Sequence, residues 1–212
     1  MISADNLHEV LEKAREATGS VAFVSQLREP YRVLVSTMLS ARTRDELTSR
    51  VTGHLFPKAG SFKELDALSV DRLEELIKPI NFYRTKAKNL KATARLIISK
   101  YKGKVPDSID ELIKLPGVGR KTANLVVSVA FDKPGVCVDT HVHRITNRWG
   151  LVETESPLQT EMALREIAPQ ALWRPLNDYL VPFGKDVCTP ISPRCSSCPI
   201  KDCPKLGVVK SR

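Results

Sequence analysis

The stretch Leu115–Ala123, which reads Leu-Pro-Gly-Val-Gly-Arg-Lys-Thr-Ala, decides the fold expected around it. Pro116 cannot donate a backbone N–H and disfavours the helical conformation in the residue before it, so a helix is expected to end there. Gly117 and Gly119 allow a tight reversal with positive φ. A second, apolar helix is expected over residues 121–131. The pattern predicts two helices joined by a hairpin whose outward-facing amides can bind an anion.

The helix ahead of this hairpin is expected to begin at a capping box. The Ser108 side chain would accept a hydrogen bond from the Glu111 amide, and the Glu111 side chain would reach back. Lys121 stands in the first turn of the helix that follows. A Gly-x-Gly segment between helices is more often a plain turn than a phosphate site, so the rest of the chain must decide what this hairpin does.

The composition is that of a folded protein with room for one domain or two modest ones, at 212 residues, 42% hydrophobic and 27% charged. No stretch approaches the ~20 apolar residues of a membrane span. Residues 1–6 lack the basic start and apolar run of a signal peptide, so the expected location is a reducing, prokaryotic-type cytoplasm, in association with the nucleoid. The formal charge of +9 suggests a polyanionic partner, although charge alone is weak support.

Nearly every segment has the periodicity of a helix, and strand patterns are scarce. Helices are expected over residues 7–14, 31–41, 46–56, 61–68, 70–77, 87–101, from 157 onwards, and over about 171–183, where Gly184 closes the last one. This pattern predicts an all-α architecture of two helical lobes. One lobe is expected over residues 23–132, with the helix-hairpin-helix at about 108–131. The other combines residues 1–22 with residues 133–212.

Residues 81–106 carry eight basic side chains and no acidic one. The apolar residues of this segment recur at steps of three and four, which places Ala87, Leu90, Ala94, Ile97 and Tyr101 on one buried stripe. The basic residues are then expected on the other faces. Solvated charged faces normally mix both signs, so an unmixed positive face favours the phosphates of DNA as its partner.

Four of the five cysteines lie within sixteen residues, in the spacing Cys188-x6-Cys195-x2-Cys198-x4-Cys203. Such crowding predicts a metal centre. Four thiolates in one loop favour a 4Fe–4S cluster, with zinc as the open alternative, although zinc sites usually pair two knuckles across a longer segment. The flanking charges favour a structural, DNA-positioning cluster over an electron carrier; they are Lys185, Arg194, Lys201, Lys205 and Lys210. The remaining Cys137 is expected to be a small buried apolar residue.

Three motifs, in this order, resemble the endonuclease III family of helix-hairpin-helix base-excision DNA glycosylases: the hairpin Leu115–Ala123, the segment Val138-Asp139-Thr140-His141-Val142, and the four-cysteine loop. The resemblance covers about Tyr31 to Cys203. It implies a two-lobed helical enzyme with a 4Fe–4S cluster and a DNA-binding cleft between its lobes. It further implies a monomer that acts on double-stranded DNA, removes oxidised pyrimidines and cleaves at abasic sites.

The resemblance assigns the nucleophile to Lys121 and the essential carboxylate to Asp139, and it assigns the cluster ligands to Cys188, Cys195, Cys198 and Cys203. A lysine at its reference pKa of ~10.4 is neutral in only about 1 in 2,500 molecules at pH 7, so an attacking amine needs a lowered pKa. The positive end of its helix and the neighbouring Arg120 both act in that direction. Asp139 is also expected to cap the helix that follows it.

DNA contacts are expected from the hairpin, from the basic segment and from two residues that fill the space left by an extruded base. The set comprises Gly117, Gly119, Arg120, Arg84, Lys86, Arg42 and Phe82. By resemblance, Arg42 and Phe82 occupy the family's wedge positions, where Gln and Leu are usual. Arginine can hydrogen-bond the unpaired base and phenylalanine can stack on it, so wedge function is expected to persist while the opposite-base preference stays open.

Three other kinds of protein compete with a bifunctional glycosylase/lyase. A monofunctional mismatch glycosylase for thymine or uracil typically lacks the hairpin lysine, and adenine glycosylases carry a Glu in the region of Ser36 and Thr37. A non-catalytic helix-hairpin-helix module that binds DNA needs neither Lys121 nor Asp139. An electron carrier would leave the hairpin unexplained. The bifunctional enzyme is therefore favoured.

Overall fold

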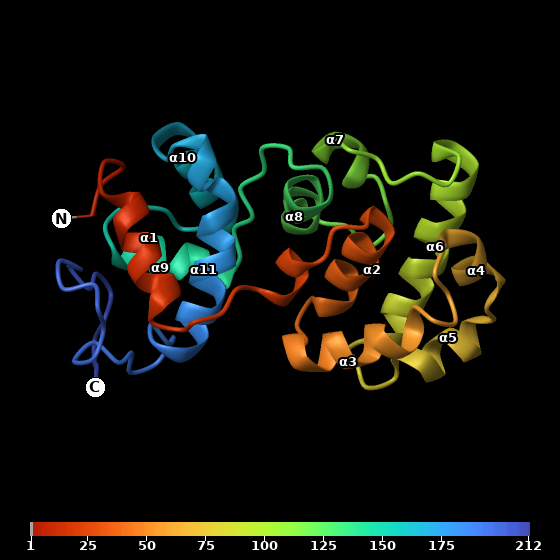
Figure 1. The fold of residues 1–212 in the computed structure, drawn as a ribbon, viewed down its shortest axis with the longest axis horizontal. Helices are drawn as coiled ribbons and strands as arrows, with labels where there is room; N and C mark the ends of the chain where they lie inside the picture. The colour runs from red at the N-terminus through yellow and green to blue at the C-terminus, as the bar shows by residue number, and fades with distance from the viewer. Residues whose placement is uncertain (1) are drawn as a thin grey trace. The chain divides into compact units, whose positions relative to one another are not determined.

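The structure is a computed structural model that describes residues 2–212, within which no strand occurs. The all-α architecture expected from the sequence is confirmed. In chain order the helices are α1 (Leu7–Glu16), α2 (Pro30–Ser40), α3 (Asp45–Leu55), α4 (Phe62–Ala67), α5 (Val70–Ile77), α6 (Tyr83–Tyr101), α7 (Ile109–Leu112), α8 (Arg120–Ala130), α9 (Thr140–Arg148), α10 (Pro157–Ile167) and α11 (Trp173–Asp186), with 3₁₀ turns at Phe23–Gln26 and Gln170–Leu172 (Figure 1).

The chain divides into two compact units. One comprises the chain up to Ala22 together with Pro134–Arg212, and the other comprises Phe23–Lys133. The sequence suggests lobes of residues 23–132 and of residues 1–22 with 133–212. That these two lobes are the domains of the protein stays a prediction.

Helix α2 forms the centre of the Phe23–Lys133 unit, where it packs against α3, α6 and α8. It begins at Pro30, whose missing N–H costs nothing in the first turn, and the Glu29 carboxylate accepts from the amides of the first turn. Apolar residues lie on most of its sides, and Leu34 and Leu39 are fully buried. Burial on every side explains why its sequence lacks the polar face of a surface helix.

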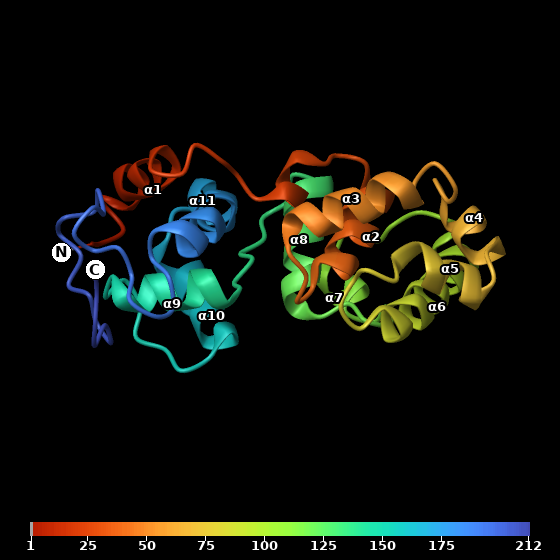
Figure 2. The ribbon, with the colours of Figure 1, turned by 90° about the horizontal axis from the view of Figure 1, so that it is seen from below.

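Helices α4, α5 and α6 form a second layer of this unit, in which α4 and α5 both pack against α6 (Figure 2). The predicted apolar stripe is confirmed at four positions, since Ala87, Leu90, Ala94 and Ile97 are buried. Tyr101, the fifth, is half-buried. The helix ends where Lys102 takes a left-handed conformation, with φ 53°.

In the other unit, α11 packs against both α1 and α9. Trp149, Phe183, Leu7 and Leu11 are among the largest side chains that this core buries completely. A capping box at Ser156 opens α10. Cys137 is buried, as the sequence predicts.

Gly184 does not end the last helix, contrary to the sequence-based expectation. Helix α11 continues to Asp186, and Gly184 lies buried inside it. A Cβ at Gly184 would lie 2.5 Å from His141 Nδ1, so the glycine is needed because α9 packs closely there. No helix within residues 2–212 is both long enough and apolar enough to span a membrane.

Candidate nucleic-acid interface and cysteine loop

The hairpin between α7 and α8 closes through a bond from the Val118 amide to the Leu115 carbonyl, 3.0 Å long. Gly117 has φ 78°, which requires glycine's freedom, as the sequence predicts. The same expectation is wrong for Gly119, which has an extended backbone with φ −89° and caps α8. A Cβ added at Gly119 would meet no atom within 4 Å. Its missing side chain therefore leaves open space beside the first amides of α8.

The hairpin rests directly on helix α6. A Cβ at Gly117 would lie 2.6 Å from Asn89 Nδ2 and 2.9 Å from Asn89 Cβ. The Thr93 hydroxyl donates to the Pro116 carbonyl over 2.9 Å. These two contacts from neighbouring turns of α6 hold the reversal in place. Asn89 and Thr93 were not expected from the sequence, because nothing in their spacing relates them to the hairpin.

Only half of the predicted capping box forms at α7. The Ser108 hydroxyl accepts from the Glu111 amide at 3.3 Å, as expected. The Glu111 carboxylate does not reach back, because it accepts from Tyr101 Oη at 2.5 Å, from Lys100 Nζ at 3.1 Å and from Lys114 Nζ. These bonds, led by the one from Lys114, lower the pKa of Glu111 to about 2. The carboxylate thus ties α7 to the end of α6.

Lys121 is exposed in the first turn of α8, beside the half-buried Arg120. The amides at this helix start have no partner within the helix, so the hairpin presents N–H donors and a positive dipole end next to Lys121. This is chemistry that can bind a phosphate.

Asp139 caps the start of α9 in the other unit, as the sequence predicts. Its Oδ1 accepts from the amides of His141 at 2.8 Å and of Val142 at 2.9 Å. The segment before it, Val136 to Val138, is buried and fixes where the carboxylate stands. Lys121 and Asp139 therefore both stand at the starts of helices, where the backbone carries partial positive charge.

The predicted unmixed positive face of α6 is wrong, because acidic residues from other elements neutralise part of it. Asp66 lies 3.2 Å from Lys91 and 2.9 Å from Arg95, and the hydrogen bond from Arg95 lowers the pKa of Asp66. Lys91 is moreover buried, with its ammonium on backbone carbonyls after α4. Glu111 likewise forms an ion pair with Lys100, at 3.1 Å.

Arg84 remains the most exposed of the basic residues expected to contact DNA from this segment. Its side chain is 75% exposed, and its Nε forms an ion pair with the Glu74 carboxylate at 3.8 Å, longer than the 2.9 Å between Arg95 and Asp66. Its guanidinium also lies over the Tyr83 ring. The N-terminal half of α6, which carries Arg84 and the exposed Lys88, is where a phosphate could reach the helix.

Arg42 and Phe82, which the resemblance names as wedge residues, lie against each other. The Arg42 guanidinium carbon stands 5.8 Å from the Phe82 ring centroid. Both residues have left-handed backbones, with φ 56° and 57°, and Phe82 is 62% exposed. An exposed cation–π contact contributes about 0.5–1 kcal/mol, which does not offset the roughly 1–2 kcal/mol of each left-handed residue. Other bonds must hold the two turns.

Those bonds come from Asn81 and Lys86. Asn81 Nδ2 donates to the Arg42 carbonyl at 2.5 Å. Lys86 Nζ reaches the Leu39 carbonyl at 2.8 Å, the Ala41 carbonyl at 2.6 Å and the Thr43 hydroxyl at 3.4 Å. Burial lowers the pKa of Lys86 to about 8, so the amine stays mostly protonated at neutral pH. The sequence predicts a phosphate contact for Lys86, and in the structure its ammonium faces the end of α2.

The four clustered cysteines follow α11 and line a single cavity. Its apolar walls come from Trp149, Phe183, Val187 and Ile200. Burial raises the pKa of Cys198 and Cys203. Within residues 2–212, no three His, Cys, Asp or Glu side chains are gathered tightly enough to hold a metal ion. The four thiols share a common space around which the loop is wrapped.

Two arginines of α9 bind the start of this loop. Arg148 is buried and donates to Cys188 Sγ at 3.4 Å, to the Thr189 carbonyl at 2.7 Å and to the Pro190 carbonyl at 2.8 Å. Arg144 donates to the Cys188 carbonyl at 2.8 Å, and its Nε is buried without a partner among the described residues. Their i, i+4 spacing places the two arginines on one face of α9, but nothing in the sequence relates that face to the cysteine loop.

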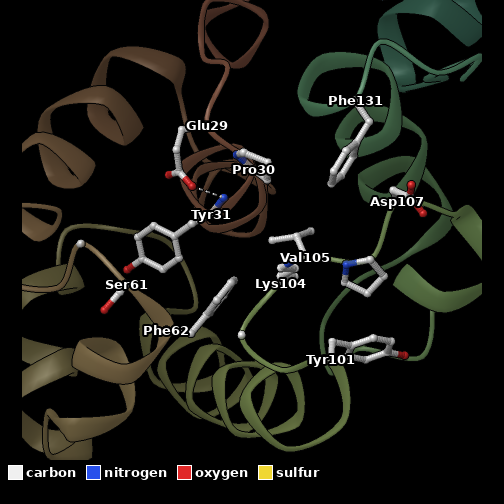
Figure 3. A pocket seen from close by; sticks show the side chains of 13 residues that line it. Glu29, Pro30, Tyr31, Ser61, Phe62, Tyr101, Lys104, Val105, Asp107 and Phe131 are labelled. Carbon is white, nitrogen blue, oxygen red and sulfur yellow. Dashed lines mark hydrogen bonds between the residues drawn. The ribbon is translucent and has the colours of Figure 1, made fainter.

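The structure has a further pocket that contains none of the predicted site residues. Figure 3 shows its aromatic lining, with Tyr31 and Phe62 on one side and Phe131 and Tyr101 on others. Of the two carboxylates in its lining, Glu29 caps α2 and Asp107 forms an ion pair with Lys133 at 2.6 Å. This pocket is therefore separate from the hairpin, from the turn at Arg42 and from the cysteine loop.

Comparison with known proteins agrees with the three motifs. Residues 35–170 match the family model described as HhH-GPD superfamily base excision DNA repair protein. Endonuclease III of Thermotoga maritima is 46% identical over 191 residues, covering 90% of this chain and 90% of that protein. The structure of a trapped endonuclease III–DNA covalent intermediate is 37% identical, covers 97% of both chains and has a TM-score of 0.87. A thermostable thymine-DNA glycosylase is 26% identical over 93% of both chains, with a TM-score of 0.81.

Proposed function

The chain belongs to the endonuclease III family of the HhH-GPD superfamily of base excision DNA repair proteins, and from that membership we propose that it removes oxidised pyrimidines from double-stranded DNA. It is a DNA glycosylase with abasic-site lyase activity. The observation that carries this proposal is the exposed lysine at the start of α8, beside a glycine hairpin whose amides can bind the backbone of the damaged strand.

Lys121 supplies the attacking amine. Its neutral Nζ forms a bond to C1′ of the damaged nucleotide while the glycosidic bond breaks and its electron pair leaves with the base. Ring opening gives a protonated Schiff base between Nζ and C1′. Loss of a proton from C2′ then breaks the bond from C3′ to its oxygen, which cleaves the strand 3′ to the lesion. Water hydrolyses the Schiff base and frees the lysine.

Asp139 provides the negative charge that these reaction steps require. Its carboxylate can take the proton from the Lys121 ammonium, or stabilise the positive charge that develops on the sugar as the base departs. Capping α9 fixes the carboxylate without consuming its charge, so the two roles are compatible.

The cysteine loop fits a 4Fe–4S cluster held by Cys188, Cys195, Cys198 and Cys203. All four thiols line one cavity, and the guanidinium groups of Arg144 and Arg148 lie beside Cys188, where they would offset the cluster's negative charge. Such a group crosslinks four points of a loop that has no regular structure of its own. The basic loop around it would then bind the DNA backbone.

Borohydride trapping tests the nucleophile. Duplex DNA containing thymine glycol or an abasic site should form a covalent adduct with the wild-type protein, because borohydride reduces the Schiff base to a stable amine. Lys121→Ala should lose the adduct and at least about 10³-fold in strand cleavage. A matched control, Lys63→Ala, removes an exposed lysine of α4 and should behave as wild type. An undiminished adduct in Lys121→Ala rejects the assignment.

Asp139→Asn tests the carboxylate. Asparagine caps a helix about as well as aspartate, so folding should be preserved while excision slows by about 10²–10⁴-fold. DNA affinity should change little. A large loss of affinity with normal catalysis at saturating DNA would make Asp139 a structural residue.

A monofunctional mismatch glycosylase is the second candidate, because the thymine-DNA glycosylase shares this fold at 26% identity. In this chain Ser36 and Thr37 are buried in α2, where an adenine glycosylase would carry a Glu. Release of thymine or uracil from mismatches without any trapped adduct would favour this candidate over the bifunctional one.

A further inference from the structure

Two exposed side chains, Arg42 and Phe82, form a stacked pair although forty positions of sequence separate them. Arg42 lies in the turn between α2 and α3, and Phe82 lies directly before α6. Each has a left-handed backbone that is unfavourable for a residue with a side chain. Because Arg42 and Phe82 lie in two separate turns, other contacts must hold these turns together.

Lys86 makes contacts of this kind. The last carbonyls of α2 lack partners within their helix, and the helix dipole adds negative charge at that end. The Lys86 ammonium donates to two carbonyls there, Leu39 and Ala41, and approaches the Thr43 hydroxyl. An ammonium has three N–H donors, so these three oxygens account for all of them. Asn81 adds a bond from the start of α6 to the Arg42 carbonyl itself.

We propose that Lys86 is a positioning residue that, with Asn81, joins the end of α2 to the start of α6 and thereby preassembles Arg42 and Phe82 as one unit. This inference rests on the proposed function and on the wedge role that the resemblance implies for the pair, which is to fill the space left by the extruded base. Preassembly means that the pair does not have to be ordered at the moment of extrusion, which favours the extruded state. Lys86 therefore acts through the backbone of the turn and leaves phosphate binding to its exposed neighbour Arg84.

Lys86→Met is the first test, because methionine keeps an unbranched stem and removes the charge and all three donors. Single-turnover excision of an oxidised pyrimidine opposite a normal base should fall by about ten- to hundredfold. Excision of the same lesion opposite a position with no base should fall less than about twofold, because no partner base has to be left unpaired. Lys63→Met removes the same charge from α4 and should match wild type on both substrates.

The salt dependence of DNA binding separates a positioning role from a phosphate contact. If Lys86 positions the turn, the slope of log K against log salt stays the same in Lys86→Met. If it binds phosphate, the magnitude of the slope falls by about 0.9. A reduced slope, or an equal loss of excision on both substrates, overturns the proposal.

A measurement without DNA separates this proposal from the proposed function. Trypsin cleaves after Arg42 and Arg44. The bonds that Lys86 and Asn81 make to this turn, together called the clamp, should protect it in the free protein. Lys86→Met and Asn81→Ala should each raise the initial rate of cleavage there by about tenfold, with no change in Lys63→Met. An unchanged rate overturns the clamp even if excision is observed. A wild-type protein that excises nothing, together with faster cleavage in both variants, rejects the proposed function and leaves the clamp supported.

Discussion

The hairpin before α8 and the helix α6 beside it were both expected to bind DNA, and they differ in how far that expectation survives. The hairpin depends on the left-handed backbone of Gly117, which glycine's own conformational freedom at that position allows. The net charge of the basic face of α6 depends on which side chains from other elements lie against it. The carboxylates of Asp66 and Glu111 both form ion pairs with residues of this helix. A motif encoded in the backbone is local, whereas the net charge of a surface is shared with partners distant in sequence.

Substitutions at Gly117 and Gly119 should differ in how far they lower the free energy of unfolding. The effect at Gly117 is the largest expected in the hairpin. Gly117→Ala forces a side chain into a left-handed backbone and against Asn89, so it should lower the free energy of unfolding by about 2–4 kcal/mol. Gly119→Ala meets open space and should cost only about 0.5–1 kcal/mol as a poorer helix cap. Urea unfolding of both variants measures the difference.

The two variants also separate folding from binding. Gly119→Ala should weaken DNA binding by about tenfold, or about 1.4 kcal/mol, because its methyl group stands where a phosphate would approach the amides. Fluorescence anisotropy with a lesion duplex measures the affinity. Unchanged binding in Gly119→Ala would mean that the bare backbone at this position serves the turn alone.

Arg84 and Arg95 test the same contrast within α6 itself. Arg84 is exposed near the first turn, so Arg84→Gln should reduce the magnitude of the salt slope of DNA binding by about 0.9. Arg95 pairs with Asp66 at 2.9 Å, so Arg95→Gln should leave the slope unchanged. Equal effects from both substitutions would restore the whole positive face as the DNA-binding surface.

Glu111 joins the two regions, and its substitution should have the smallest effect. Its folded pKa of about 2 lies below its ordinary value of 4.5. A lowered carboxyl pKa contributes stability that is fully present above pH 4.5 and disappears as the pH falls toward 2. Glu111→Gln should therefore lower the melting temperature slightly at pH 7 and progressively less below pH 4.5. A difference that stays constant down to pH 3 would show that the charge of Glu111 is unimportant.

The turn at Arg42 shows why part of the site was unpredictable. Arg42 and Phe82 were named from the resemblance, but their contact with each other was not foreseen, since no local pattern links them. Lys86 was read as one more positive charge because periodicity reports only which face of a helix it occupies. Its role depends on where α2 ends, which is a property of packing between helices.

Local sequence patterns suffice to predict the helical class, the hairpin before α8, the capping role of Asp139 and the grouping of four cysteines. Each of these depends on residues close together in the chain, because helix caps, turns and ligand spacings act over a few positions. The tertiary structure alone decided which lysines of α6 remain available, why Gly184 is small and how Lys86 holds the turn at Arg42. Those outcomes depend on side chains that meet only after the helices have packed, so no local pattern could contain them.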